Sequence, residues 1–434
     1  FSQFTVCAVR LAYVDFFGSL DACKKRLDVS HAPSRFYAQQ MISSRRKFVS
    51  SLAVPVTFSA LNSIAQDEAS ISKRYLSFLN WIKSMTPESG MGLSGYMFSF
   101  RKYISSLSTL ATADSILLHL RMGNVDFAKN AANGLVHWHQ FILRNAPDPV
   151  KGGLSSEFIL RNGNWTHGDY FYASDNLLAI SALLELHMAT KIDRYAATAQ
   201  LIGRWLEKTL FDGKRLGVWS INYGPAMQYM RSDGAANNAI HTGMDFLWLN
   251  ALRGLHGIET NLGWNQRLEK AIDFYKSSMA PEGCWFDYFQ PHRVNQASGN
   301  WHWYRNTYLT IGDNTLRSAL AAHSFDLKDQ TAAFSKWLNP SNGKWLWGYL
   351  DPKSCAPKFL PADTVYFDVV CTGLLRSWYT KTGQQQLAAK CQQALDMLQS
   401  ENGGWHWGVQ ESNLQPLNSE QALVTGCWAL ANLA

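Results

Sequence analysis

Three short stretches, Gly283-Cys-Trp285, Gly343-Lys-Trp345 and Gly403-Gly-Trp405, recur at intervals of 60 residues and decide the fold. Each follows a helical pattern that ends in a turn containing Pro, Ser or Asn. Glycine at such a place fits the left-handed residue that commonly ends a helix, and its neighbours are turn formers. A repeat of this length is typical of helical hairpins arranged as a toroid or a solenoid.

Between these markers, amphipathic helical segments alternate with more apolar ones. The amphipathic set is 67–85, 124–143, 193–209, 264–279, 328–338 and 383–400, and the apolar set is 105–120, 172–190, 236–256, 306–325, 363–380 and 418–433. Helices that are apolar all round belong inside a fold, and amphipathic ones belong outside. The sequence therefore predicts an all-α protein, an (α/α)6 barrel or six-hairpin toroid, with twelve helices in inner and outer rings.

The two unpaired terminal helices indicate whether the barrel closes. A closed ring requires segment 67–85 to pack beside segment 418–433, which gives each of them a partner. The alternative is a linear helical solenoid, whose two terminal faces would need polar caps. Trp428, Leu430 and Leu433 make a poor cap, so we expect the closed ring.

Composition limits the classes of function. Of 434 residues, 47% are hydrophobic and 17% are charged, which is typical of a globular protein. The net charge of +7 is concentrated before residue 66, and the rest of the chain has no tract rich in Lys or Arg, so no nucleic-acid partner is expected. Five cysteines after residue 65 form no cluster with each other or with histidine, so neither a metal site nor a cofactor is predicted.

The beginning of the chain is predicted not to belong to the barrel. Residues 1–40 show no sustained periodicity and are interpreted as upstream read-through. Residues 41–65 contain Arg45-Arg46, an uncharged run over 49–61 and Ser63-Ile-Ala65, in the order of a secretory signal. The motif resembles the twin-arginine (Tat) export signal. We therefore expect a catalytic barrel over 66–434, recognised by the Tat machinery of a bacterium, periplasmic or secreted, with no stable membrane insertion after signal removal.

The long connections are the expected place for a functional site. They run from outer to inner helices and lie on one rim: 86–104, 144–171, 210–235, 280–305, 339–362 and 401–417. Nine of the 17 Trp residues fall in them, and flat aromatic faces suit sugar rings. The predicted substrate-binding residues are Trp165, Tyr170, Trp285, Trp301, Trp303, Tyr308, Trp345, Trp347, Trp405, Trp407, Asn238, His241 and His302. For the periodic Trp285, Trp345 and Trp405, the alternative is that they plug the base of each loop.

The inner helices share an acidic position, which predicts a ring of acids at similar height around the barrel mouth. Its members are Asp114, Asp175, Asp245, Asp313, Asp368 and Glu420. Asp175 and Asp313 share the setting Tyr-x4-Asp-Asn-x-Leu and are the predicted catalytic pair. Paired carboxylates are what glycosidic cleavage requires. The alternative for each acid is an ordinary helix cap or a partner of the helix dipole.

A second constellation favours a different chemistry. Asn237-Asn238-x-x-His241 lies one hairpin before His302 and Tyr308. Polysaccharide lyases of the toroid type neutralise a uronate with Asn and His, and abstract a proton with Tyr or His. Paired asparagines at a helix start are also ordinary capping residues.

Over residues 67–434 the chain resembles the six-hairpin glycosidase superfamily, whose members cleave or remodel sugars. The stretch Leu395-Asp-Met-Leu-Gln399-Ser-Glu-Asn-Gly403-Gly-Trp405 also resembles the QW repeat of terpene-cyclase toroids, but the Asp-x-Asp-Asp motif of squalene cyclases is absent. The expected function is an exported carbohydrate-active enzyme, a glycoside hydrolase acting on an oligo- or polysaccharide with paired carboxylates. The alternatives are a lyase acting on a uronate-containing polymer, an isoprenoid-cyclase-like toroid and a non-catalytic carbohydrate-binding toroid.

Overall fold

The computed structural model divides the chain into two compact units, Phe1–Glu68 and Ala69–Ala434. The residues it describes all lie in the second unit. They are 73–83, 95–97, 102–103, 106–148, 150–168, 170–209, 221–223, 229–231, 240–259, 263–277, 279, 283–285, 288–289, 309–311, 313–338, 348–350, 357–359, 366–406, 408–410, 420–422, 427 and 430. The predicted read-through and signal segments, 1–40 and 41–65, lie outside these residues.

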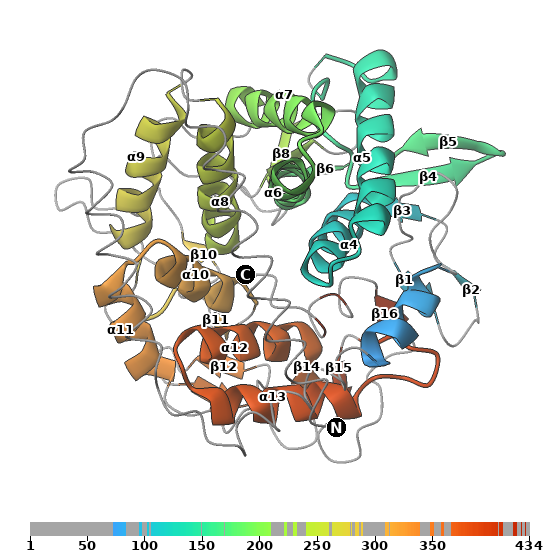
Figure 1. Cartoon of the computed structure of the whole chain (residues 1–434). Coiled ribbons are helices and arrows are strands. Elements are labelled where there is room, and N and C mark those ends of the chain that lie inside the picture. Colours follow the sequence, from blue (N-terminus) through green and yellow to red (C-terminus); the bar gives the residue numbers. More distant parts are fainter. Residues whose placement is uncertain are drawn as a thin grey trace, which may run out of the picture. The chain divides into compact units, whose positions relative to one another are not determined.

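Within the second unit the helices form two concentric sets. The inner helices are α4 (Thr109–Arg121), α6 (Ala173–Thr190), α8 (Thr242–Ile258), α10 (Asp313–Ser324) and α12 (Val369–Lys381). The outer helices are 73–83, α5 (Val125–Asn145), α7 (Asp193–Thr209), α9 (Trp264–Ser277), α11 (Lys328–Leu338) and α13 (Gln385–Met397). Each inner helix packs against the outer helix that follows it, and successive inner helices pack side by side (Figure 1). Of the predicted inner segment 418–433, residues 420–422 form a strand instead of a helix, whereas Cys427 and Leu430 are helical and buried.

The ring closes between the two ends of the second unit. Arg74, on the first outer helix, forms an ion pair of 2.8 Å with Asp396 of α13. The side chain of Gln399 donates to the Arg74 carbonyl oxygen at 3.2 Å. Strand β1 (Gly95–Met97) also pairs with β16 (Glu420–Ala422), which joins the first long connection to the last one. The predicted (α/α)6 barrel is therefore confirmed, and the linear solenoid is excluded.

Short strands, which the sequence did not predict, organise the long connections. They are β2 (Lys102–Tyr103), β3 (Ser106–Ser108), β4 (Glu157–Arg161), β5 (Asn164–His167), β6 (Phe171–Tyr172), β7 (Ile221–Tyr223), β8 (Tyr229–Arg231), β9 (Ile240–His241), β10 (Tyr288–Phe289), β11 (Leu309–Ile311), β12 (Gly348–Leu350), β13 (Pro357–Phe359), β14 (Tyr366–Asp368) and β15 (Gly408–Gln410), besides β1 and β16. The antiparallel sheets are β3-β4-β5, β6-β7-β8, β9-β10, β11-β12-β13, β14-β15 and β2-β1-β16. Each sheet therefore joins the strand before an inner helix to strands of a neighbouring long connection.

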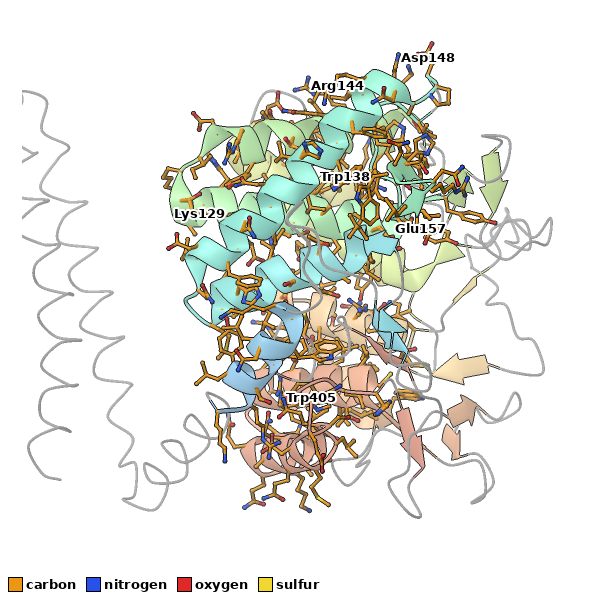
Figure 2. The ribbon with its side chains drawn as sticks, turned by 90° about the vertical axis from the view of Figure 1, so that its right-hand side faces the viewer. Lys129, Trp138, Arg144, Asp148, Glu157 and Trp405 are labelled. Atoms are coloured by element: carbon orange, nitrogen blue, oxygen red, sulfur yellow. The ribbon has the colours of Figure 1, made fainter. Side chains whose placement is uncertain are left out.

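The barrel has two unlike ends. Inner-to-outer turns are short, such as the turn from Arg121 to Val125, whereas outer-to-inner connections are long and carry the strands. Figure 2 shows Asp148 and Glu157 at the end where the strands gather, and Lys129 toward the opposite end. We name these the long-connection end and the short-turn end. No described helix combines the length and the apolar character that a membrane span requires.

Candidate active site at the long-connection end

Asp175 lies in the first turn of the inner helix α6 and is 5% exposed. Its carboxylate accepts a hydrogen bond of 2.8 Å from the Ser174 hydroxyl and another from Ser156. Burial raises the pKa of Asp175 to about 6, although both serine hydrogen bonds act to lower it. A carboxyl group with this pKa can hold a proton near neutral pH and deliver it to a substrate, which is the task of a general acid.

Asn176, the next residue, has a structural task. Its side-chain oxygen accepts from the Leu154 N–H at 2.7 Å, and its amide donates to the carbonyl oxygens of Leu154 and Tyr172 at 2.9 Å each. The amide thus fixes the end of the long connection against the start of α6. In this pair, Asp175 therefore has a carboxyl group with a shifted pKa, and Asn176 holds the backbone around it.

The alternative that Asp175 is an ordinary helix cap is not what the structure shows. The capping residue of α6 is Tyr172, which makes no side-chain cap hydrogen bond. The hydrogen bonds that lower the pKa of Asp175 come from serine hydroxyls rather than from backbone N–H groups of its helix. Its position in the first turn nevertheless places it near the positive end of the helix dipole.

Tyr172 is an electrostatic neighbour of this carboxyl group and stacks on Tyr170. The rings of Tyr170 and Tyr172 stack with their centroids 5.6 Å apart and their planes 17° apart, and Tyr172 is 36% exposed. The pKa of Tyr172 is raised by burial first, and then by the charges of Asp175, Tyr170 and Glu157. Trp165, on β5, is half-buried and packs edge-on against Trp138 of α5, with 6.1 Å between the ring centroids. These aromatic faces are of the kind on which sugar rings stack.

Glu157 is a second carboxylate of this region, and the sequence analysis missed it. It begins β4, is half-buried, and contributes to the raised pKa of Tyr172, as Asp175 does. Gly168 makes room for it, because a Cβ there would lie 2.7 Å from Glu157 Cγ. The sequence gives no signal for this residue, because Glu157 becomes a neighbour of Tyr172 only once the strands before α6 have folded.

The predicted acids occupy different positions within their helices and strands. Asp114 lies deep in α4 and is fully buried, whereas Asp313 is the first residue of α10 and Asp368 ends the strand before α12. Asp245 lies within α8, and Glu420 begins β16. The six acids thus lie at different positions relative to the starts of their helices or strands, and their arrangement as a level ring stays a prediction. The side chains of Asp245, Asp313, Asp368 and Glu420 lie outside the described part of the chain, so the pairing of Asp175 with Asp313 stays a prediction.

Two of the predicted substrate-binding tryptophans belong to the core instead. Trp285 is fully buried, stacks on Tyr275 and donates its indole N–H to the Tyr275 carbonyl oxygen at 3.4 Å. Trp405 is 1% exposed and donates to the Leu395 carbonyl oxygen at 2.9 Å. In both, the acceptor lies ten residues earlier, on the preceding outer helix. These two residues therefore plug the bases of their connections, and their assignment to substrate binding was wrong.

The other predicted binding residues cannot be placed in this site. His241 lies in β9, opposite Tyr288 of β10. The remaining ones fall outside the described residues: Asn238, Trp301, His302, Trp303, Tyr308, Trp345, Trp347 and Trp407. Among the residues that are described, no group of three or more His, Cys, Asp or Glu side chains is arranged to hold a metal ion.

A cavity of about 1030 Å³ occupies the middle of the barrel and extends to its short-turn end. Leu178, Ser181, Glu185 and Met188 line it from one face of α6, which matches the spacing of residues along a helix face. Leu178 is about one helical turn from Asp175. Neither Asp175 nor any other described residue of the predicted site lines this cavity.

Comparisons with solved structures bear on the fold. The chain is similar to cellobiose 2-epimerase from Spirochaeta thermophila, with a TM-score of 0.65 and 13% identity over 88% of this chain and 98% of the other. It is similar to a D-mannose isomerase (TM-score 0.58, 11% identity, covering 86% of this chain and 99% of the other). A glycosidase variant in complex with glucose has a TM-score of 0.56 and 12% identity, covering 86% of this chain and 97% of the other.

The comparisons by sequence give no match. No protein-family model matches the chain, and no curated protein does. The likeness to the solved structures therefore shows the fold alone, an (α/α)6 barrel of helical hairpins.

Proposed function

We propose that the protein is a carbohydrate-active enzyme, and specifically a glycoside hydrolase in which Asp175 is the general acid. One observation carries the proposal: a buried carboxyl group with its pKa raised to about 6 stands at the long-connection end, close to Tyr172, whose ring stacks on that of Tyr170. Fold does not fix function, so the proposal depends on the residues of this site. The similar structures named as sugar-converting enzymes agree with it.

In the proposed reaction, Asp175 donates its proton to the glycosidic oxygen as the bond to the sugar carbon breaks. A second carboxylate then either attacks that carbon or activates a water molecule. Asp313 is the first candidate for this role because it repeats the sequence setting of Asp175. Glu157 is the second, because it lies with Asp175 around Tyr172. The two roles need opposite protonation states, and the raised pKa suits Asp175 to that of the acid.

Sugar epimerisation or isomerisation is a second candidate function. The similar structures include a cellobiose 2-epimerase and a D-mannose isomerase. Asp175 would then move a proton at a sugar carbon or hydroxyl instead of at a glycosidic oxygen. The lyase alternative, with Asn238, His241, His302 and Tyr308, is a third outcome that the same assay separates.

The test is a screen of neutral and uronate-containing oligo- and polysaccharides with the wild-type protein and Asp175→Asn. Hydrolysis releases new reducing ends, elimination adds the ultraviolet absorbance of an unsaturated product, and epimerisation changes the sugar without either. We expect reducing ends from the wild type and a loss of about 100-fold or more in Asp175→Asn. Thr198→Ser, a change on the outer helix α7, is the control and should retain activity. Full activity of Asp175→Asn would overturn the assignment, and binding without turnover would favour a carbohydrate-binding toroid.

We also propose that the protein is exported through the Tat pathway with residues 41–65 as its signal. The support is the order of Arg45-Arg46, the uncharged run 49–61 and Ser63-Ile-Ala65. Expression of the full chain in a bacterium, followed by mass spectrometry of periplasmic protein, should find an N-terminus near Gln66. Changing both Arg45 and Arg46 to Lys should stop export, and unaltered export would contradict the proposal.

A further inference from the structure

The central cavity is lined by the cations Arg121, Arg253, Arg317 and Lys381, which come from four inner helices. Three of them lie toward its mouth at the short-turn end. Arg121 and Lys381 are the last residues of α4 and α12, and Arg253 lies in the last turns of α8. Glu185 of α6 is the carboxylate among the lining residues, and its Oε2 atom lies 3.9 Å from Nη2 of Arg121. Leu120 and Met188 belong to the apolar part of the wall.

Arg253 is held in place by its neighbours. Its guanidinium group donates to the Asn250 side chain at 2.9 Å and to the Ser324 carbonyl oxygen at 3.4 Å, and lies 4.5 Å from the centre of the Phe325 ring. Glu185 offsets part of its charge, because the pKa of Glu185, raised by burial, is lowered by Arg121 and Arg253. The guanidinium groups of Arg121 and Arg253 thus both interact electrostatically with the carboxylate of Glu185.

Lys381 has like charges as its electrostatic neighbours. Burial lowers its pKa, and the charges of Arg121 and Arg253 lower it further. Within the described part of the chain, no carboxylate acts on this ammonium group. The mouth therefore carries more positive than negative charge. It is concave and partly shielded from water, so the electrostatic attraction for a bound anion is stronger there than at an open surface.

We propose that this mouth, between Lys381, Arg121 and Arg253, is a binding site for a small organic anion that carries a carboxylate or phosphate group. Guanidinium groups bind both groups through paired charge-assisted hydrogen bonds, and an ammonium group adds a point charge. The cavity volume of about 1030 Å³ leaves room for the rest of such a molecule along the wall of α6 and α8. The site is separate from Asp175, which lies at the other end of the inner helices, and it stands whether or not the chain hydrolyses glycosides.

Helix ends offer a simpler reason for cations here, since basic groups stabilise the C-terminal ends of helices. That explanation predicts a benefit from Lys381 that does not depend on the anion present. The anion site predicts a benefit that appears only when a carboxylate or phosphate is added. The two explanations are therefore separable by measuring the same variants with and without anions.

The experiment measures thermal unfolding of the full chain at constant ionic strength with citrate, inorganic phosphate, glucose 6-phosphate or glucose. We expect a saturable rise of the midpoint with at least one anion, and any rise with glucose, which has no anionic group, should be the same in Lys381→Met as in the wild type. The most effective anion shows whether the site prefers a carboxylate or a phosphate group. In Lys381→Met the apparent dissociation constant for that anion should rise about tenfold, as expected for losing one charge-assisted contact.

Lys390→Met is the matched control, because Lys390 is exposed on the outer helix α13. It should bind the anion as the wild type does. Arg121→Gln provides a second loss-of-binding variant if Lys381→Met folds poorly. The proposal is overturned if no anion raises the midpoint at constant ionic strength, or if Lys381→Met and Lys390→Met respond alike.

Discussion

Gly403 lies directly against the carbonyl oxygen of Ser77, so that a Cβ on the glycine would overlap that oxygen. Ser77 belongs to the first outer helix, and Gly403 follows the last one. Gly283 has the same relationship to the carbonyl oxygen of Ala333 on α11, where a Cβ would lie 2.8 Å away. Both glycines have a φ of 96°. The contact that joins neighbouring hairpins within the ring is therefore repeated where the ring closes.

Replacing Gly403 with Ala should destabilise the protein by more than the strain of a positive φ accounts for. Gly383→Ala is the control, since Gly383 also has a positive φ of 77° but nothing within 4 Å of its Cβ position. We expect Gly383→Ala to cost about 1 kcal/mol and Gly403→Ala about 2 kcal/mol more, measured by urea unfolding. Equal losses of unfolding free energy in the two variants would show that Gly403 and the Ser77 carbonyl oxygen are not in close contact.

Asp175→Asn and Asn176→Ala should have opposite effects: the first should reduce activity, and the second should reduce stability. Asn176→Ala leaves the buried N–H and carbonyl groups of Leu154 and the carbonyl oxygen of Tyr172 without their side-chain partner, so it should lower the free energy of unfolding by about 3 kcal/mol. Asp175→Asn should lose activity while its stability near neutral pH stays at or above that of the wild type. Urea unfolding and turnover are measured on both variants. A stable, fully active Asn176→Ala variant would contradict the structural role.

The raised pKa of Asp175 predicts how stability depends on pH. The folded state holds this proton up to about pH 6, whereas the unfolded carboxyl, with its ordinary pKa of 3.8, releases it earlier. Between these values the folded state binds more protons, so this group stabilises the fold most below pH 3.8, and that contribution is lost as the pH rises to about 6. The total loss is at most about 3 kcal/mol.

The measurement compares wild type and Asp175→Asn by urea unfolding across this pH range. Titration of every other group is common to both proteins, so the difference in their free energies isolates Asp175. The variant should gain relative to the wild type as the pH rises. A difference that is constant with pH would mean that the carboxyl of Asp175 titrates normally in the folded protein.

Periodicity predicted the barrel because each hairpin repeats one packing problem: an apolar helix must be covered by an amphipathic one. The recurring Gly-x-Trp stretches mark the places where the chain turns between them, and Gly403 and Trp405 show why both residue types are needed. The same periodicity explains why Trp285 and Trp405 were misassigned. A residue that recurs in every repeat serves the architecture of the repeat, whereas a substrate site breaks the symmetry.

The site was only partly predictable for a related reason. Asp175 stood out because it shares the setting Tyr-x4-Asp-Asn-x-Leu with Asp313 in the sequence. Glu157 did not, because its closeness to Tyr172 depends on the pairing of short strands that have no hydrophobic pattern of their own.

The most direct test of the proposed function is the pH dependence of kcat/KM in the wild type and in Ser174→Ala, on whichever carbohydrate the screen identifies. Ser174 donates to the Asp175 carboxylate at 2.8 Å and thereby lowers its pKa. If Asp175 is the acid, activity falls above about pH 6 in the wild type, and Ser174→Ala moves that fall to higher pH by up to about one unit. The contradicting result is a fall at the same pH in both proteins, which would assign the titrating group to another residue.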